Sequence, residues 1–341
     1  MSHDTFMKRA LELAELGRGM VSPNPMVGCV IVNDGNIIGE GYHQKHGEHH
    51  AEVNAITSVV DQSLLADSTI YVTLEPCAHF GKTPPCADLI IDKGIKHVVV
   101  ACLDPFEKVA GKGIQKLIDS GADVEVGVLE RDATELNKRF FTSIKKQRPY
   151  VILKWAQTDD GYVAKENFDS KWITNKYSRQ LVHKWRTEED AILVGKNTAL
   201  HDNPSLTARD WKGKNPVRVL LDTNLEVPKT YNLFNSEAPT LVLNSIKDEE
   251  ESNIKWIKVD LNNPLNVLQK LAEQNIQSVI VEGGSQTLNS FMDQNCWDEA
   301  RVFTASKQFG KGISAPLPKG ELIKTESIFD DLMKTYKNTN G

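Results

Sequence analysis

The sequence has no long apolar run, no excess of positive charge and few cysteines. A membrane-spanning helix needs about 20 consecutive apolar residues, and no stretch of the chain supplies them. Residues 1–17 have the amphipathic pattern of a helix rather than of a signal peptide, so we expect a cytoplasmic protein without a membrane partner. A formal net charge of −6 argues against general nucleic-acid binding.

Five cysteines are an odd number, which does not suit a disulfide framework in a chain of 341 residues. Cys29 and Cys102 lie in apolar, strand-like segments typical of core thiols, and Cys296 ends a helical pattern. The remaining pair, Cys77 and Cys86, lies in the segment EPCAHFGKTPPC. This pair is the candidate for metal binding.

The length predicts two domains, because single cores stop growing below this size. Up to residue 146, strand-like segments alternate with helical ones, which predicts a mostly parallel sheet covered by helices. We expect helices over residues 4–17 and 131–146. A second α/β set of strands begins at YVILKWA, so the domains are predicted at 1–146 and 147–341. Beyond about residue 310 only a terminal hairpin pattern is visible, and its role is not indicated.

A zinc site can be assembled from two segments that begin helical patterns. His50 and Glu52 open the first and Cys86 opens the second, where a helix start favours a thiolate. Side chains two residues apart in a regular helix point about 200° apart, so His50 and Glu52 face one cavity only at an irregular first turn. One imidazole and two thiolates are three ligands of tetrahedral zinc, with the fourth position left for water. We therefore expect His50, Cys77 and Cys86 to bind Zn²⁺.

The chemistry expected of this site is hydrolytic deamination. Zinc lowers the pKa of a bound water from about 15.7 to about 7, which provides a nucleophile at neutral pH. Glu52, adjacent but not a ligand, is then the catalytic residue that carries a proton from water to the departing amine. His-x-Glu followed by Pro-Cys and a second Cys is the pattern of zinc deaminases. Eight residues, 78–85, separate the cysteines instead of the usual two, which leaves His79 as an alternative ligand to Cys86.

The segments SPNPMVGCVIV, GYHQKHGEHHAE and TLEPCAHFGKTPPC together resemble the bifunctional deaminase/reductase family of riboflavin biosynthesis, in which the wide cysteine spacing is usual. The resemblance implies a cytidine-deaminase-like three-layer α/β/α domain followed by a dihydrofolate-reductase-like α/β domain. It implies deamination of 2,5-diamino-6-ribosylamino-4(3H)-pyrimidinone 5′-phosphate, then reduction of the ribosyl group to ribityl with NADPH, giving 5-amino-6-ribitylaminouracil 5′-phosphate. It further implies substrate contacts at Asn24, His43 and Lys82, and a homodimer or homotetramer.

The second half lacks the G-x-G-x-x-G motif of common dinucleotide-binding folds. It has SVIVEGGSQTLNSFM, a strand that turns through two glycines into a helix, where free N–H groups suit a phosphate. The resemblance implies NADPH contacts at Gln157, Trp172, Thr198, Asp202, Thr223, Gly283, Gly284 and Ser285. It implies contacts to the substrate's phosphate and pyrimidine at Ser170, Arg186, Leu206, Arg209 and Glu282.

Lys154 interrupts an otherwise apolar strand, and a buried lysine is costly unless it is paired. We therefore expect Lys154 to contact the substrate, and either Lys154 or Asp202 to deliver a proton to the sugar oxygen. Arg186 and Arg209 suit a phosphomonoester because the planar guanidinium donates paired hydrogen bonds. At Thr158 and Asp159 the chain reads TDDG where the family reads SLDG.

Two other functions compete with this interpretation. A nucleic-acid base deaminase would share the zinc site but needs a basic channel, and it leaves the second half unexplained. A zinc-stabilised scaffold without activity would fill the fourth zinc position with a protein ligand. Neither alternative explains Glu52 together with the glycine turn of the second half.

Overall fold

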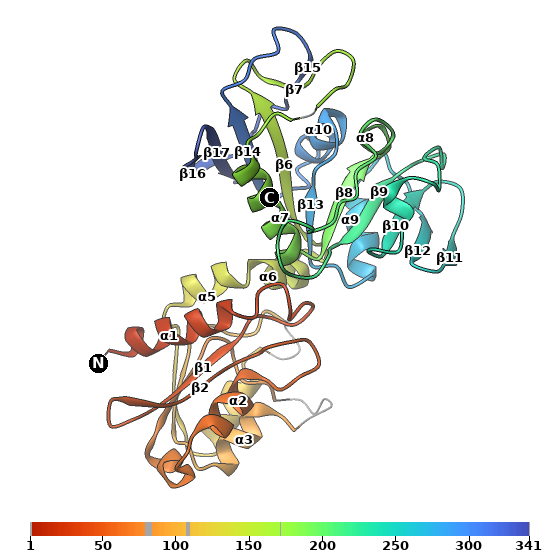
Figure 1. Ribbon diagram of the computed structural model, residues 1–341. Coiled ribbons are helices and arrows are strands. Elements are labelled where there is room, and N and C mark those ends of the chain that lie inside the picture. The colour runs from red at the N-terminus through yellow and green to blue at the C-terminus, as the bar shows by residue number, and fades with distance from the viewer. Residues whose placement is uncertain (1, 79–83, 107–109, 171, 341) are drawn as a thin grey trace. The chain divides into compact units, whose positions relative to one another are not determined.

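The computed structural model describes residues 2–78, 84–106, 110–170 and 172–340. The chain divides into two compact units, Met1–Lys146 and Gln147–Gly341, here called unit 1 and unit 2. Each unit has a sheet of its own with helices packed on both faces (Figure 1). Among the described residues, none of the helices is both long and apolar enough to span a membrane.

The sheet of unit 1 has antiparallel strands at one side and parallel strands at the other. Across the sheet the strands are β2 (Asn36–Tyr42), β1 (Gly28–Asn33), β3 (Thr69–Val72), β4 (His97–Val100) and β5 (Asp123–Val126). β1 runs antiparallel to both β2 and β3, whereas β3, β4 and β5 are parallel. A hairpin joins β1 to β2, and the predicted βα alternation accounts for the parallel part.

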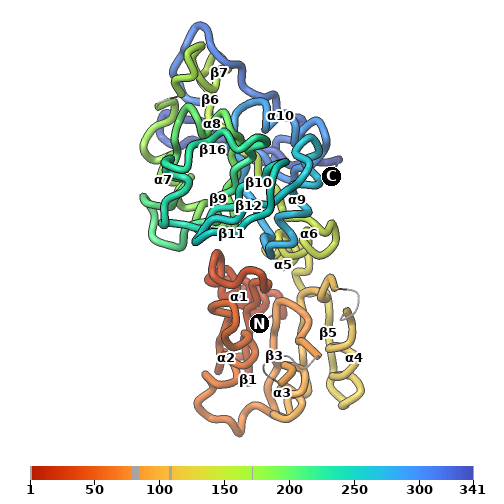
Figure 2. The backbone as a smooth tube through the Cα atoms, turned by 90° about the vertical axis from the view of Figure 1, so that its right-hand side faces the viewer, coloured from red at the N-terminus to blue at the C-terminus, as the bar shows by residue number. Residues whose placement is uncertain are grey.

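Helices cover both faces of this sheet, so unit 1 is a three-layer α/β/α structure (Figure 2). On one face lie α1 (His3–Glu15), α5 (Glu130–Leu136) and α6 (Lys138–Lys146); on the other lie α2 (Ala51–Ser58), α3 (Cys86–Asp92) and α4 (Lys112–Asp119), and η1 (Gln62–Asp67) is a short 3₁₀ helix. Alternate strand residues serve the two layers, as Val30 and Ile31 show. Cys29 and Cys102 are buried in these cores, as predicted.

The single helix expected over residues 131–146 was wrong, because the chain forms α5 and α6 with Asn137 between them. The Asn137 amide donates to the carbonyl of Met26 at 2.8 Å and accepts from the N–H of Met26 at 2.8 Å. These two bonds satisfy a buried amide, while the helical i→i−4 bonds from Asn137 to Ala133 and from Phe141 to Asn137 continue across the break. The break between α5 and α6 is thus local and falls at the residue that makes this tertiary contact.

Unit 2 is built on a larger, mostly parallel sheet. Its strand order is β11 (Glu249–Glu251), β12 (Ile254–Lys258), β10 (Thr240–Asn244), β9 (Val217–Leu221), β8 (Ala191–Gly195), β13 (Ser278–Val281), β6 (Tyr150–Thr158), β14 (Glu299–Ala305), β17 (Asp331–Lys337) and β16 (Glu321–Ile328). From β12 through β14 neighbouring strands are parallel. β16 and β17 form the terminal hairpin that the sequence predicted.

Two pairs of helices enclose the sheet of unit 2. α9 (Pro264–Glu273) and α10 (Ser285–Asp293) pack on one face, while α7 (Lys176–Glu188), α8 (Lys196–Asp202) and the short η2 (Asn232–Phe234) pack on the other. A small separate sheet pairs β7 (Tyr162–Ala164) with β15 (Ile313–Ser314). The apolar runs of β8 and β13 fit their burial on both faces of a parallel sheet.

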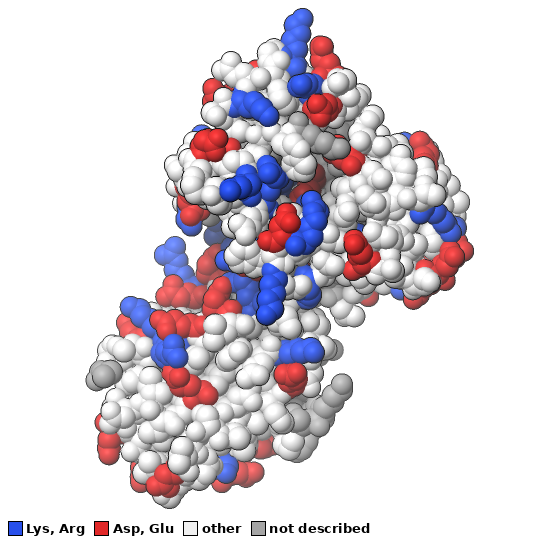
Figure 3. Space-filling view, viewed as in Figure 1, with Lys and Arg blue, Asp and Glu red and all other residues white. Residues whose placement is uncertain are grey.

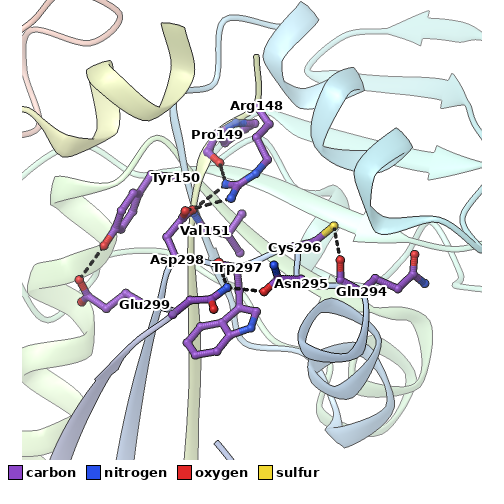
Figure 4. Close-up of polar contacts among 11 residues, drawn as sticks. Arg148, Pro149, Tyr150, Val151, Gln294, Asn295, Cys296, Trp297, Asp298 and Glu299 are labelled. Atoms are coloured by element: carbon purple, nitrogen blue, oxygen red, sulfur yellow. Dashed lines mark hydrogen bonds and ion pairs between the residues drawn. The ribbon is translucent and has the colours of Figure 1, made fainter. Parts of the chain in front are cut away.

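A buried ion pair fixes the start of β6 against the start of β14 (Figure 4). The guanidinium of Arg148 donates to both carboxylate oxygens of Asp298, at 2.6 and 2.9 Å, and the same carboxylate accepts from the N–H of Val151 at 2.9 Å. Nearby, the Tyr150 hydroxyl donates to Glu299 at 3.0 Å. Because ligands bind at the carboxyl ends of parallel strands, this ion pair lies at the end of the sheet opposite to the expected site.

Candidate functional site

Three side chains of unit 1 converge at the ends of two helices. His50 caps α2 in an extended conformation, with φ −70° and ψ 164°, and Cys86 is the first residue of α3. His50 Nδ1 lies 3.6 Å from Cys77 Sγ and 3.3 Å from Cys86 Sγ. Among the described residues, these three form the one group of His, Cys, Asp or Glu atoms, all within 4.8 Å of one another, that is spaced to share a metal ion.

The donor set fits zinc in both chemistry and spacing. With a Zn–S bond of about 2.3 Å and a Zn–N bond of about 2.0–2.1 Å, tetrahedral geometry separates nitrogen from sulfur by about 3.6 Å. The measured separations of 3.3 and 3.6 Å agree with that value. One imidazole with two thiol groups is also a usual ligand set of catalytic zinc, which keeps one position open.

The surrounding chain shifts the pKa values of the two thiols in opposite directions. A hydrogen bond from Cys86 lowers the pKa of Cys77 to about 4, whereas the hydrogen bond to Cys77 and burial raise the pKa of Cys86. The backbone N–H of Cys86 also donates to Cys77 Sγ at 3.3 Å. The N–H at the start of α3 thus stabilises negative charge on the Cys77 sulfur, and the thiolate expected at Cys86 stays a prediction.

Glu52 lies in the first turn of α2, next to the metal-binding group, and is 3% exposed. Burial raises the pKa of Glu52 to about 7, the Cys77 thiolate adds to that rise and His50 opposes it. Because His50 precedes the helix and Glu52 is inside it, both side chains reach the same region, as the sequence predicted. A buried carboxyl group with a pKa near neutrality is suited to accept and release a proton.

Asn24 and His43 form a connected pair in unit 1. His43 Nδ1 lies 2.9 Å from the carbonyl oxygen of His49, which can only accept, so Nδ1 carries the proton. His43 Nε2 lies 3.1 Å from Asn24 Nδ2 and accepts from that amide when the imidazole is neutral. Burial lowers the pKa of His43, which favours this neutral form. The pair adjoins the metal-binding residues, with the rings of His43 and His50 5.7 Å apart.

The buried carboxylate of Glu75 supports the segment that carries Cys77. It accepts hydrogen bonds from the backbone N–H groups of Asp104 at 3.2 Å, Gly111 at 2.9 Å and Gly113 at 2.8 Å. A Cβ atom at Gly113 would lie 1.9 Å from the Pro76 carbonyl oxygen, so only glycine fits there. These contacts hold the Glu75–Cys77 segment against the start of α4.

Unit 2 contains a cleft of about 960 Å³ near the carboxyl ends of β6, β8, β9 and β13. Its walls come from strand ends, from α7 and α8, and from the start of α10. The N–H of Gly284 donates to the Thr198 hydroxyl at 2.8 Å, which ties the glycine turn to α8. Gly283 packs against β8 so closely that a Cβ atom would lie 2.8 Å from the N atom of Gly195.

Three largely buried charges meet at the wall of this cleft. Arg186 Nη2 donates to Glu282 at 2.9 Å, and Lys154 Nζ lies 3.8 Å from the same carboxylate. Burial favours the neutral acid, but Arg186 and Lys154 outweigh it and hold the pKa of Glu282 at about 2. Burial lowers the pKa of Lys154, Glu282 opposes that shift and Arg186 reinforces it. The cleft therefore holds an amine that gives up its proton more readily than an exposed lysine.

Comparisons with known proteins assign both units. A model described as the cytidine and deoxycytidylate deaminase zinc-binding region matches residues 1–102, and the RibD C-terminal domain matches residues 149–339. The riboflavin biosynthesis protein RibD of Aquifex aeolicus is 48% identical over 316 residues, which cover 91% of this chain and 88% of that protein.

The chain belongs to the RibD family.

Solved structures of the family agree over the whole chain. The Thermotoga maritima diaminohydroxyphosphoribosylaminopyrimidine deaminase/5-amino-6-(5-phosphoribosylamino)uracil reductase has a TM-score of 0.91 at 41% identity, covering 98% of both chains. Acinetobacter baumannii RibD has a TM-score of 0.90 at 34% identity, covering 99% of both. The chain is thus a bifunctional enzyme of riboflavin biosynthesis with a zinc-binding deaminase domain and an NADPH-dependent reductase domain. The two predicted folds, deaminase-like and dihydrofolate-reductase-like, are confirmed.

Most residues that the resemblance to RibD suggested for unit 2 line the cleft. The predicted cofactor contacts found there are Trp172, Thr198, Asp202, Thr223, Gly283, Gly284 and Ser285, and the predicted substrate contacts are Lys154, Ser170, Arg186, Leu206, Arg209 and Glu282. Gln157 is not part of the cleft wall, and its amide oxygen instead accepts from the Trp155 indole at 2.9 Å. Lys82 and the alternative ligand His79 lie outside the described residues.

Two residues with prominent contacts near these RibD sites were missed by sequence reasoning. Glu75 lies directly before Pro76-Cys77, at the end of a strand-like segment. His183 lies within the helical pattern of α7. Their partners, Gly111 and Thr207, are 36 and 24 residues away along the chain. A charged residue between an apolar strand and a proline was the one available signal for Glu75.

Glu75→Gln is expected to lower the free energy of unfolding by about 1–3 kcal/mol, because it weakens a buried, charge-assisted set of hydrogen bonds. Urea denaturation of the full chain measures this change. Asp119→Asn, at the exposed end of α4, is the matched control and should stay within about 0.5 kcal/mol of the parent. Equal effects of the two substitutions would contradict a supporting role for the Glu75 carboxylate.

Proposed function

We propose that unit 1 deaminates 2,5-diamino-6-ribosylamino-4(3H)-pyrimidinone 5′-phosphate and that unit 2 then reduces the ribosyl side chain of the product. The observation that carries this proposal is the zinc-compatible group of His50, Cys77 and Cys86 next to the buried Glu52. In the same chain, a separate unit holds the cleft with Lys154 and Glu282.

In the deamination, His50, Cys77 and Cys86 hold the zinc ion. When bound, zinc lowers the pKa of water so that hydroxide is available near neutral pH. Glu52 takes a proton from the attacking water and passes it to the exocyclic amine, so that water adds to the amidine carbon and ammonia leaves. Asn24 and His43, connected at 3.1 Å, orient the substrate. Lys82 is a further proposed contact, outside the described residues.

In the reduction, the residues that would hold the cofactor are Trp172, Thr198, Thr223 and Gly283, all in the cleft wall. When bound, NADPH supplies a hydride to carbon 1′ of the ring-opened sugar. The N–H groups in the first turn of α10 (nine residues), beyond the Gly284 N–H that donates to Thr198, suit a phosphate of the cofactor.

The substrate is held by Ser170, Leu206, Arg209 and the Arg186–Glu282 pair, with the arginines suited to its phosphate. Lys154 is the better candidate for the proton donor to the sugar oxygen, because burial lowers the pKa of its amine. Asp202 instead accepts a hydrogen bond from the Ser170 hydroxyl at 3.2 Å, which suits a role in positioning.

A small phosphorylated pyrimidine is the partner that these sites suit, rather than nucleic acid. On the face that Figure 3 displays, acidic and basic side chains are interspersed and do not form a continuous basic channel. A cytoplasmic location and a homodimer or homotetramer complete the proposal, and both rest on the resemblance to the family.

The proposal predicts that the pure protein releases one ammonia and oxidises one NADPH for each diaminopyrimidinone phosphate consumed. Ammonia is followed by a coupled assay that uses NADH, measured separately from NADPH absorbance. Removing zinc with a chelator should stop ammonia release but leave NADPH oxidation intact when 5-amino-6-(5-phosphoribosylamino)uracil is supplied directly. Ammonia release without NADPH loss on either substrate would refute the bifunctional assignment.

A further inference from the structure

His183 occupies a buried position at the wall of the unit 2 cleft. It lies on α7, one helical turn before Arg186, and only 5% of it is exposed. Its Nδ1 lies 2.9 Å from the carbonyl oxygen of Thr207, and its Nε2 lies 3.2 Å from the carboxylate of Asp210. Arg186 donates to the same Thr207 carbonyl at 3.0 Å.

The two residues that His183 contacts lie on either side of Arg209 in the sequence. Thr207 precedes Arg209 by two residues and Asp210 follows it directly. The segment is also held by the left-handed backbone of Leu206, with φ +52°, and by a hydrogen bond from the N–H of Ala208 to Asn215 at 2.9 Å. The position of Arg209 in the cleft wall therefore depends on the contacts of His183 with Thr207 and Asp210.

Both contacts require a proton on the imidazole. A carbonyl oxygen only accepts hydrogen bonds, so Nδ1 must carry hydrogen. The ion pair with Asp210 forms only when Nε2 is protonated as well, so the ring that serves both partners is the imidazolium ion. The neutral ring keeps its bond to Thr207 and turns a lone pair toward Asp210.

We propose that His183 is a positioning residue of the reductase cleft, whose imidazolium form ties Asp210 back and so presents Arg209 to the substrate's phosphate. This inference rests on the proposed function only in naming the phosphorylated substrate. When His183 loses its proton, the Asp210 carboxylate is released beside Arg209, where it competes with the phosphate for the guanidinium and repels it.

The charged groups that face His183 set the pH range of this effect. Burial lowers the pKa of His183, Arg186 and Arg209 reinforce the shift, and Asp210 opposes it. Glu282, on the far side of Arg186, is the remaining anion that senses His183. Burial and the two arginines therefore favour the neutral ring, Asp210 favours the imidazolium, and a bound phosphate dianion raises the pKa of His183. Substrate binding thus takes up a proton and weakens as the pH rises.

The kinetic test compares wild type with His183→Asn between pH 7 and 8.5, where the phosphate of the substrate is mostly dianionic. The Asn amide can replace Nδ1 as the donor to Thr207, but it does not titrate. In wild type, KM for 5-amino-6-(5-phosphoribosylamino)uracil is expected to rise about tenfold across this range, as loss of one charge-assisted hydrogen bond implies. In His183→Asn it should be high and independent of pH, with kcat and KM for NADPH unchanged.

Two further variants separate this role from a purely structural one. Asp210→Asn should also remove the pH dependence of KM, because the competing carboxylate is gone. His97→Asn, an exposed histidine of unit 1, should behave as wild type. Identical pH profiles in wild type and His183→Asn, or a fall in kcat with no change in the KM profile, would overturn the proposal.

An NMR titration tests the inference without any catalytic assay. The His183 ring signals, assigned by their loss in His183→Asn, should give a pKa that rises when ribose 5-phosphate is added and falls in Asp210→Asn. A pKa that responds to neither refutes the role of His183, even in an active reductase. A pKa that responds to both, in a protein that fails to oxidise NADPH, supports the role of His183 while refuting the proposed reduction.

Discussion

Glu52→Gln is expected to reduce ammonia release by about 10³-fold or more while zinc stays bound. Glutamine preserves the size of the Glu52 side chain, which is 3% exposed. It removes the carboxyl group that is proposed to carry a proton from water to the amine. General acid–base catalysis contributes about 10²–10⁴-fold, and here one carboxyl group serves both steps. Because burial already raises the pKa of Glu52 to about 7, a neutral amide replaces a group that is partly neutral, and the fold is retained.

The controls for Glu52→Gln use both halves of the chain. NADPH oxidation should be normal when the deaminated intermediate is supplied, and zinc content by elemental analysis should equal that of the parent. Glu48→Gln, an exposed carboxylate four residues away, should leave ammonia release unchanged. Loss of zinc together with activity would make Glu52 a ligand, and retained ammonia release would end its proposed role.

The sequence was most informative where the functional residues are close together along the chain. His50 and Glu52 are two residues apart, so their spacing alone requires an irregular helix start, and the extended His50 at the start of α2 satisfies that requirement. The pairing of His50 with Cys77 and Cys86 spans 27 and 36 residues. Sequence separation alone could not show that His50 lies close to the two cysteines in space. The zinc-deaminase pattern was needed to connect these three residues.

Long-range polar contacts explain what the sequence could not predict. Asn137, between α5 and α6, pairs its amide with Met26, 111 residues earlier. The Arg186–Glu282 pair spans 96 residues, and neither residue is unusual in its own segment. Lys154 was the exception, since a charge within an apolar strand is visible locally, and the structure shows that this charge is indeed buried beside Glu282. The sequence thus revealed a charged side chain that is costly to bury, but not the residues that pair with such a charge.

Lys154→Met is expected to lower the rate of NADPH oxidation by about 10²–10⁴-fold, the usual contribution of a general acid. Methionine keeps the length and apolar body of the side chain and removes the amine that is proposed to protonate the sugar oxygen. Glu282 keeps its bond to Arg186 at 2.9 Å, so the substitution leaves no unpaired buried charge, and the fold should be retained. Single-turnover reduction of 5-amino-6-(5-phosphoribosylamino)uracil, followed by NADPH absorbance, measures the effect.

Complementation makes the result for Lys154→Met decisive. This variant should still release ammonia at the parental rate, because Glu52 and the metal ligands belong to the other compact unit. Mixed with Glu52→Gln, it should restore NADPH oxidation from the diaminopyrimidinone substrate, since one variant makes the intermediate that the other reduces. Lys258→Met, an exposed lysine on β12, should match the parent in every assay. If Lys154→Met reduces the intermediate at the parental rate, the proton must come from another group in the cleft, and Asp202 becomes the residue to test.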